Sequence, residues 1–168
     1  DLECRVRTDI DRSKVGNQSI CFCTKPGLVC GSDEITYSVC QMKAKEIETN
    51  YATRMISRGP CKTGPKIISI GESRTVKKGT SVSVLCEVEG FPMPSIIWFF
   101  TSPRNKENVK LPGDSDEISI SYRGGPQAMR ITSHLQITNF NYKHEGNYRC
   151  FADNDMGMTM KNVTLVDG

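Results

Sequence analysis

Alternating hydrophobic and polar residues mark the second part of the chain. In the stretch SVSVLCEV, every second residue is apolar or a cysteine, and these residues are Val82, Val84, Cys86 and Val88. A period of two residues is typical of a β-strand that buries one face. The stretch therefore predicts a half-buried strand.

The next apolar stretch, SIIWFF, is hydrophobic on both faces of the expected strand. Ile96, Trp98 and Phe100 share one parity, and Ile97 and Phe99 share the other. Four more strand-like stretches follow, separated by Gly, Pro, Asn and Asp: ISISYR, RITSHLQI, GNYRCFA and MTMKNVTLV. Many short strands with such turns predict an all-β sandwich or barrel.

Two cysteines, a tryptophan and a tyrosine narrow this choice. Trp98 lies twelve positions after Cys86, and Tyr148 lies two positions before Cys150. The order Cys, Trp, Tyr-x-Cys is the signature of an immunoglobulin sandwich, in which a disulfide joins the sheets and the indole packs on it. The tyrosine hydroxyl is expected to hold the loop before its strand.

The first part of the chain has a different pattern. The stretch SVCQMKAKEIET predicts a helix capped by Ser38, with Cys40, Ala44 and Ile47 on one face. The segment 35–37 before it predicts a short strand. A helix on a small hairpin follows from these elements.

Six of the eight cysteines lie before residue 62: Cys4, Cys21, Cys23, Cys30, Cys40 and Cys61. This density predicts a disulfide framework in a small domain with little core, and therefore an oxidising compartment. The alternative is a zinc site, which requires paired cysteines or nearby histidines. Both histidines, His134 and His144, lie in the other half, where a strand and a surface turn are expected.

Composition and charge exclude several classes of protein. With 37% hydrophobic and 24% charged residues, the 168-residue chain is expected to fold into one or two domains. A net charge of +3 is too small for a nucleic-acid-binding surface. A weak glycosaminoglycan contact through Lys77, Lys78, Arg104, Lys106 and Lys110 stays open beside the simpler reading of solvated loops.

No membrane span, enzyme or cofactor is expected. The sequence has no apolar run of about 18 residues. No serine or cysteine has a histidine partner that would make it a nucleophile, and no acidic loop has a defined calcium spacing. The start DLECRV lacks a signal pattern, so a secretion signal is expected to have been removed or to lie upstream. Two sequons, at Asn17 and Asn162, fit a secreted glycoprotein.

The stretch VCGSDEITYSVC resembles the Kazal signature. A Kazal module followed by an immunoglobulin domain is similar to the insulin-like growth factor-binding protein-related family, in its Kazal plus immunoglobulin branch. Leu2-Glu3-Cys4 and Cys21-Phe22-Cys23 resemble the end of that family's cysteine-rich N-terminal domain. Further resemblance lies in Gly64-Pro65, Leu111–Asp114 and Arg123–Pro126.

The resemblance implies a fold and its boundaries. We expect a small disulfide-rich α+β Kazal-like domain followed by an all-β, I-set-like immunoglobulin sandwich. The expected parts are a hairpin tail at 1–22, the Kazal-like domain at 23–62, a linker at 63–66 and the immunoglobulin-like domain at 67–168. The implied disulfides are Cys4–Cys21, Cys23–Cys40, Cys30–Cys61 and Cys86–Cys150, although other connectivities of the first six cysteines stay open.

The resemblance also implies a function. The expected protein is secreted and extracellular, and it binds an insulin-like growth factor or an insulin-family peptide, with other growth factors, receptors, matrix or a second copy as further partners. If Trp98 and Cys150 point inward, the opposite parity predicts an exposed partner surface. Its residues are Ile97, Phe99, Phe151, Met158 and Met160. The alternative is that the Kazal-like module or a glycan on Asn162 covers this patch.

A different function is the inhibition of a serine protease. By resemblance to Kazal inhibitors, the loop Thr24, Lys25 and Pro26 would present Lys25 to a trypsin-like enzyme. Pro26 opposes this, because it has no N–H and restricts the residue before it. The loop is one residue shorter than usual, and the framework lacks the third Kazal bridge.

We therefore expect trypsin to keep its activity when mixed with this chain at a one-to-one ratio. A loop without full disulfide support lacks the preorganisation that gives such inhibitors their affinity. The measurement is the residual hydrolysis of a chromogenic lysine substrate. Stoichiometric loss of trypsin activity, abolished by Lys25→Ala, would establish the inhibitor instead.

Overall fold

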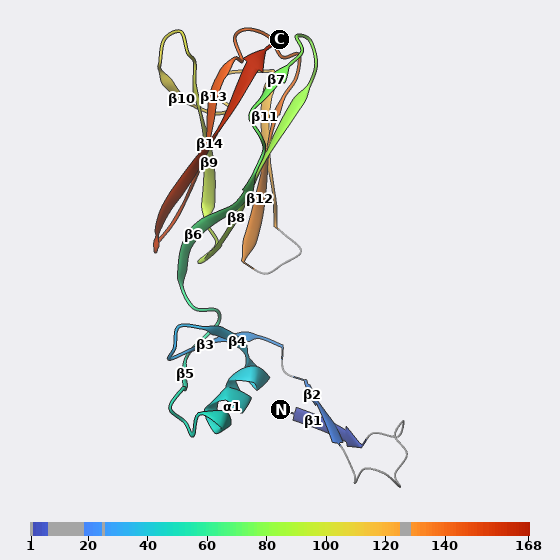
Figure 1. The fold of residues 1–168 in the computed structure, drawn as a ribbon, viewed down its shortest axis with the longest axis vertical. Coiled ribbons are helices and arrows are strands. Elements are labelled where there is room, and N and C mark those ends of the chain that lie inside the picture. The colour runs from blue at the N-terminus through green and yellow to red at the C-terminus, as the bar shows by residue number, and fades with distance from the viewer. Residues whose placement is uncertain (1, 7–18, 25, 125–128) are drawn as a thin grey trace. The chain divides into compact units, whose positions relative to one another are not determined.

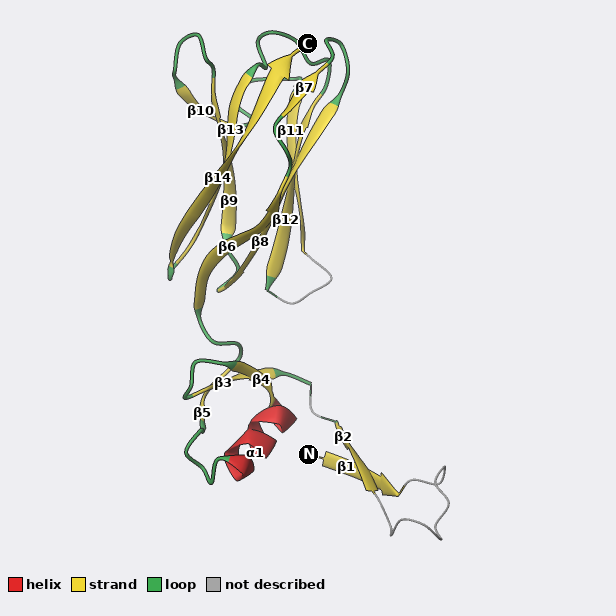
Figure 2. Cartoon of the chain, viewed as in Figure 1, coloured by secondary structure: helices red, strands yellow, loops and turns green. Residues whose placement is uncertain are grey.

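The computed structural model describes residues 2–6, 19–24, 26–124 and 129–168, with only the backbone of 2–6 and 19–22. The chain divides into two compact units, residues 1–61 and 62–168 (Figures 1 and 2). Among the described residues, no helix is both long and apolar enough to span a membrane.

The first unit contains a two-stranded hairpin and a three-stranded sheet with one helix. In the hairpin, β1 (Leu2–Val6) pairs antiparallel with β2 (Ser19–Cys23). The sheet has the order β4-β3-β5. Its elements are β3 (Leu28–Gly31), β4 (Thr36–Ser38), α1 (Val39–Glu48) and β5 (Met55–Arg58).

The helix begins where the sequence predicts. The hydroxyl of Ser38 accepts a hydrogen bond from the backbone N–H of Gln41 at 3.2 Å, and the Gln41 side chain accepts one from the Ser38 N–H at 2.9 Å. This reciprocal capping box satisfies two donors that the helix itself leaves unpaired.

The buried face of α1 differs from the expected one. Ala44 is exposed, and Ile47 is 71% exposed, whereas Met42 is 2% exposed. The expected face was chosen around Cys40, but Cys40 bonds to Cys23, which is exposed. The sheet covers the face that carries Met42 instead.

Two disulfides hold the described part of this unit. Cys23 bonds to Cys40, and Cys30 of β3 bonds to Cys61. Both pairs are those implied by the family resemblance. The side chains of Cys4 and Cys21 lie outside the described part, although the backbone register sets the two residues opposite each other.

The second unit is a sandwich of two sheets. One sheet has the order β10-β9-β13-β14-β7 and the other β11-β12-β8-β6. The first comprises β7 (Arg74–Val76), β9 (Ser95–Thr101), β10 (Asn108–Lys110), β13 (Gly146–Asn154) and β14 (Gly157–Asp167). The second comprises β6 (Thr63–Ile70), β8 (Val82–Phe91), β11 (Ile118–Gly124) and β12 (Arg130–Ile137).

Residues 63–66, expected to form a linker, lie in strand β6. Thr63 pairs with Phe91, and its hydroxyl accepts a hydrogen bond from the Phe91 N–H at 3.1 Å. Pro65 fits this strand because β6 lies at the edge of its sheet, where a missing N–H is tolerated.

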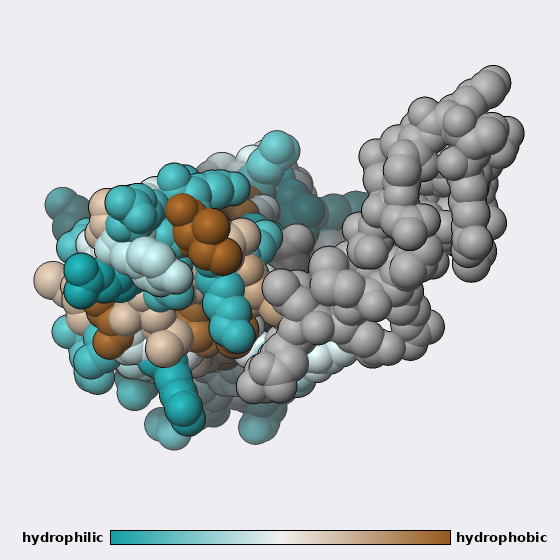
Figure 3. Space-filling model, turned by 90° about the horizontal axis from the view of Figure 1, so that it is seen from below, coloured by the Kyte–Doolittle hydropathy of each residue, from teal (hydrophilic) through white to brown (hydrophobic). Residues whose placement is uncertain are grey.

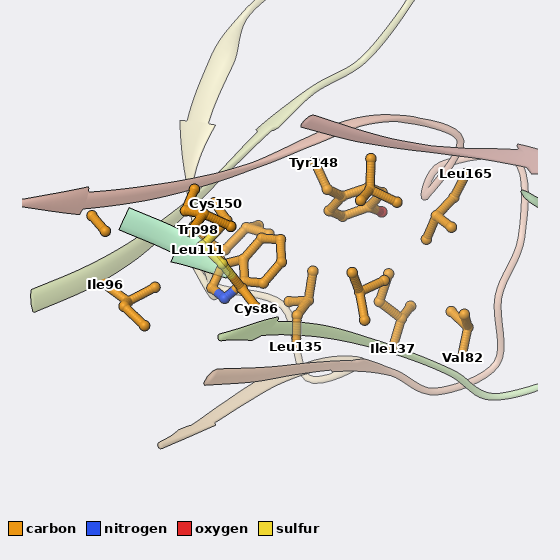
Figure 4. Close-up of a cluster of buried hydrophobic side chains, with 14 of the residues drawn as sticks. Val82, Cys86, Ile96, Trp98, Leu111, Leu135, Ile137, Tyr148, Cys150 and Leu165 are labelled. Atoms are coloured by element: carbon orange, nitrogen blue, oxygen red, sulfur yellow. A yellow bond between two sulfur atoms is a disulfide. The ribbon is translucent and has the colours of Figure 1, made fainter. Parts of the chain in front are cut away.

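The core of the sandwich surrounds a disulfide between the sheets (Figure 4). Cys86 of β8 bonds to Cys150 of β13, and Trp98 of β9 is fully buried with them. The indole Nε1–H of Trp98 donates a hydrogen bond to the hydroxyl of Ser133 at 2.9 Å. The immunoglobulin sandwich expected from the sequence is confirmed.

The turn before β13 is anchored by Tyr148. Its hydroxyl donates a hydrogen bond to the carbonyl oxygen of His144 at 2.6 Å, as the sequence predicts. Burial raises the pKa of the Tyr148 hydroxyl far above its usual range, so the group remains a donor.

His144 is buried, which corrects the expectation of a surface residue. Its ring lies 5.8 Å from that of Phe140, its Nδ1 accepts a hydrogen bond from the Asn141 N–H, and its Nε2 lies 3.2 Å from Glu117 Oε2. Burial, the largest cause, lowers the pKa of His144 below its ordinary value of 6.5; Glu117 opposes the shift and Lys143 adds to it.

We expect the unfolding free energy to fall as the pH drops below about 6.5, the ordinary pKa of histidine. In that range the histidine binds a proton more readily in the unfolded chain than in the folded one. The unfolding free energy therefore decreases as the pH falls through this range and is fully regained above about pH 6.5. His144→Gln should flatten the dependence between pH 7 and pH 5 in urea titrations. His134→Gln is the matched control, and equal slopes in all three proteins would contradict the prediction.

Candidate protein-binding face

The outward side of three neighbouring strands carries the candidate surface. The inward residues of β9 and β13 include Ile96, Trp98, Tyr148, Cys150 and Ala152, each at most 5% exposed. Because successive side chains of a strand point to opposite sides, the residues between them face outward. The inward and outward sets are those predicted from the alternation.

The strand register arranges these outward residues in rows. The central row joins Ile97, Phe151 and Met160 across β9, β13 and β14. The row on one side joins Ser95, Asp153 and Met158, and the row on the other joins Phe99, Arg149 and Asn162. We call these three rows the β9–β13–β14 face.

The aromatic residues of the face contact each other. The rings of Phe99 and Phe151 lie 6.3 Å apart at 82°, an edge-to-face arrangement. Such pairs contribute about 0.5–1.5 kcal/mol beyond the area they bury. This contact fixes two large apolar side chains in the middle of the sheet surface.

The methionines are the most exposed of the apolar residues of the face. Met158 is 72% exposed and Met160 is 56% exposed. The β13–β14 ladder runs without a register shift, so both methionines stay on the side of Phe151. Methionine is flexible and polarisable, which suits a surface that adapts to a partner.

Polar groups border the apolar rows. Ser95 donates a hydrogen bond to the Asp153 carboxylate, and Arg149 Nε donates one to Asn162 Oδ1 at 3.2 Å. One acidic and one basic side chain therefore lie on either side of Phe151 along β13. An apolar centre with a polar border is the usual anatomy of a protein–protein interface.

The sandwich matches a known family and known structures. Residues 65–154 match the family model described as "Immunoglobulin domain". The chain belongs to the immunoglobulin-domain family. Among solved structures, a chimeric titin Z1Z2 protein shares the fold at a TM-score of 0.52, with 22% identity over 64% of this chain and 96% of that chain.

Two curated relatives extend beyond the immunoglobulin domain. Insulin-like growth factor-binding protein-related protein 1 of Cupiennius salei is 35% identical over 98% of this chain and 63% of its own length. Kazal-type serine protease inhibitor domain-containing protein 1 of Homo sapiens is 36% identical over 98% of this chain and 54% of its own length. These relatives confirm the resemblance to the insulin-like growth factor-binding protein-related family.

This immunoglobulin-domain chain spans only part of those relatives. It covers between half and two thirds of the length of each. The relatives' names therefore describe longer proteins.

The structure describes some of the other sites predicted from the sequence and leaves others outside the described residues. Asn162 is exposed on β14, whereas Asn17 lies outside the described residues. In the expected inhibitor loop, Thr24 and Pro26 are exposed and Lys25 lies outside the described residues. Within the described ranges, no group of three or more His, Cys, Asp or Glu is placed to hold a metal ion.

Two exposed methionines near the face were not predicted from the sequence. Met93 and Met156 are each 50% exposed, and each lies in a turn that flanks the strands of the face. The Asn154 side chain links these turns, because its Nδ2 donates to the Pro92 carbonyl and its Oδ1 accepts from the Met156 N–H, both at 2.9 Å. Side chains in turns do not alternate between two faces, so the alternating pattern could not predict on which side these methionines lie.

Proposed function

We propose that this chain is a non-enzymatic, secreted binding module. The observation that carries the proposal is the β9–β13–β14 face, where the exposed Met158 and Met160 adjoin the half-buried Ile97, Phe99 and Phe151 on one sheet surface. Contiguous apolar patches on the surface of a soluble domain often mark an interaction site.

The partner that we propose is an insulin-like growth factor or a related insulin-family peptide. The support is the name of a relative, insulin-like growth factor-binding protein-related protein 1, which resembles this chain over nearly its whole length. The small disulfide-linked first unit is proposed as a Kazal-like module, which agrees with the name of the second relative. Its helix and two bridges support that assignment.

Exposed apolar surface is not confined to the sandwich. The first unit exposes Ile35, Ile47, Tyr51, Met55 and Ile56. The space-filling view from below shows hydrophobic residues on the surface among hydrophilic ones (Figure 3). These residues lack the cross-strand rows of the β9–β13–β14 face, so the proposal assigns the ligand to the face.

The direct test is isothermal titration of the whole chain with an insulin-like growth factor at micromolar concentration. We expect saturation at one ligand per chain, with binding more exothermic at the higher of two temperatures, because buried apolar surface gives a negative heat-capacity change. The binding enthalpy can be zero at one temperature, and measuring at a second temperature excludes this as the cause of an absent signal. Absence of heat at both would refute this ligand for the chain.

The face itself is tested by Phe99→Asp combined with Phe151→Asp. Charges in the middle of an interface should weaken binding by about thirtyfold or more, since the loss of a central aromatic contact costs about 2 kcal/mol or more. Ile68→Asp, on β6 of the other sheet, is the matched control, because Ile68 is an apolar strand residue at 36% exposure and lies outside the face.

A less disruptive variant separates binding from folding. Met158→Asp with Met160→Asp changes highly exposed side chains, so the melting temperature should stay near that of the unmodified chain while affinity falls. Met55→Asp in the first unit is the corresponding control. Unchanged affinity in both face variants would place the ligand elsewhere.

A further inference from the structure

The outward side of the β9–β13–β14 sheet has two parts. We call the rows through Phe151 and Met158 the apolar half; the second of these rows also carries Ser95 and Asp153, which hydrogen-bond to each other. The other part is the polar half. The row Phe99, Arg149 and Asn162 forms the division. The row on its polar side joins Thr101, Asn147 and Thr164. The polar half thus begins directly beside the row that carries Phe99 and the sequon asparagine, Asn162, and it contains the sequon threonine, Thr164.

The polar half is hollowed. A hollow of about 450 Å³ lies at this end of the sheet. Thr101, Asn147 and Thr164 line it, together with Ser102, Lys106 and Glu145. Most of its lining surface is apolar, with Pro103, Leu165 and Val166 among the lining residues, while the hydroxyl, amide and charged groups supply donors and acceptors.

Asn162 is placed for modification. It is exposed, the next residue Val163 is buried at 1% exposure, and Thr164 is exposed again on the side of Asn162. The Oδ1 atom of Asn162 accepts the hydrogen bond from Arg149, so Arg149 does not hold the Nδ2 atom, to which a glycan would be joined.

We propose that Asn162 carries an N-linked glycan whose first sugars lie over the row of Thr101, Asn147 and Thr164 and the hollow beside it, and leave the apolar half open to the ligand. The glycan then lies along one border of the binding face and does not shield the apolar residues of the face. The reason is chemical: sugar hydroxyls find partners along Thr164, Asn147 and Thr101, whereas Met160 and Phe151 on the other side offer none.

The modification is an ordinary glycosyl transfer. The Nδ2 atom of Asn162 bonds to the anomeric carbon of a lipid-linked oligosaccharide diphosphate. The nitrogen loses one proton, and the lipid diphosphate leaves with the electron pair of the broken C–O bond. The oligosaccharide donor belongs to the secretory pathway, so this inference rests on the part of the proposed function that makes the chain secreted.

The first test is occupancy of the site. The full chain carrying Asn17→Gln is secreted from a eukaryotic cell line behind a signal sequence, and its mass is compared with that of the Asn17→Gln, Asn162→Gln variant. We expect the glycan mass to be lost with Asn162→Gln and with Thr164→Ala, but to be kept with Thr164→Ser. A chain without a glycan on Asn162 would overturn the proposal.

The second test is the position of the glycan, read by chemical labelling of intact folded protein. Amine acetylation of Lys106, which lines the hollow, should be several-fold slower in the glycosylated chain than in the Asn162→Gln variant. Oxidation of Met160 by peroxide should be the same in both. Lys77 and Met55 are the internal controls, since both are exposed and lie outside the face.

Protection of Met160, or equal labelling of Lys106 in the two forms, would overturn the proposed position. Neither test uses a ligand, so both remain decisive if the proposed function fails. If the ligand does bind, the glycosylated and Asn162→Gln forms should have the same affinity, and weaker binding by the glycosylated form would show that the glycan covers the apolar half.

Discussion

The disulfide between Cys86 and Cys150 is the constraint on which the second unit depends. It joins β8 of one sheet to β13 of the other, and Trp98 of β9 is buried beside it. The indole N–H then reaches Ser133 of β12. Four strands from both sheets are thereby fixed in register. A native disulfide that closes a loop of this length typically contributes about 2–5 kcal/mol.

The same constraint determines the candidate face. A slip of one residue would turn every side chain of a strand to the other side, so the inward position of Trp98 and Cys150 forces Ile97 and Phe151 outward. The unshifted β13–β14 ladder carries this parity to Met160. The strand register therefore determines both the buried core and the outward apolar surface. A variant with a changed register would lose both.

Residues whose environment is set by strand parity were predictable from the sequence. The alternation around Cys86 and Trp98 gave the core and the outward face, and Ser38 gave the start of the helix. The burial of Met42 and of His144 was not predictable, because each depends on segments that fold back from elsewhere in the chain. His144 is enclosed by Glu117, distant in sequence, and Ser133 meets Trp98 across 35 positions.

The two units differ in how they hold their shape, and this bears on which one presents a binding surface. The described core of the first unit contains few buried apolar side chains, namely Val29, Cys30, Met42 and Cys61, and two of these four are cysteines in one bridge. The sandwich instead has a large continuous core. A surface on a well-packed sheet loses little backbone freedom on binding, which favours affinity. Flexible methionines on that rigid support then let the face adjust to its partner without reshaping the fold.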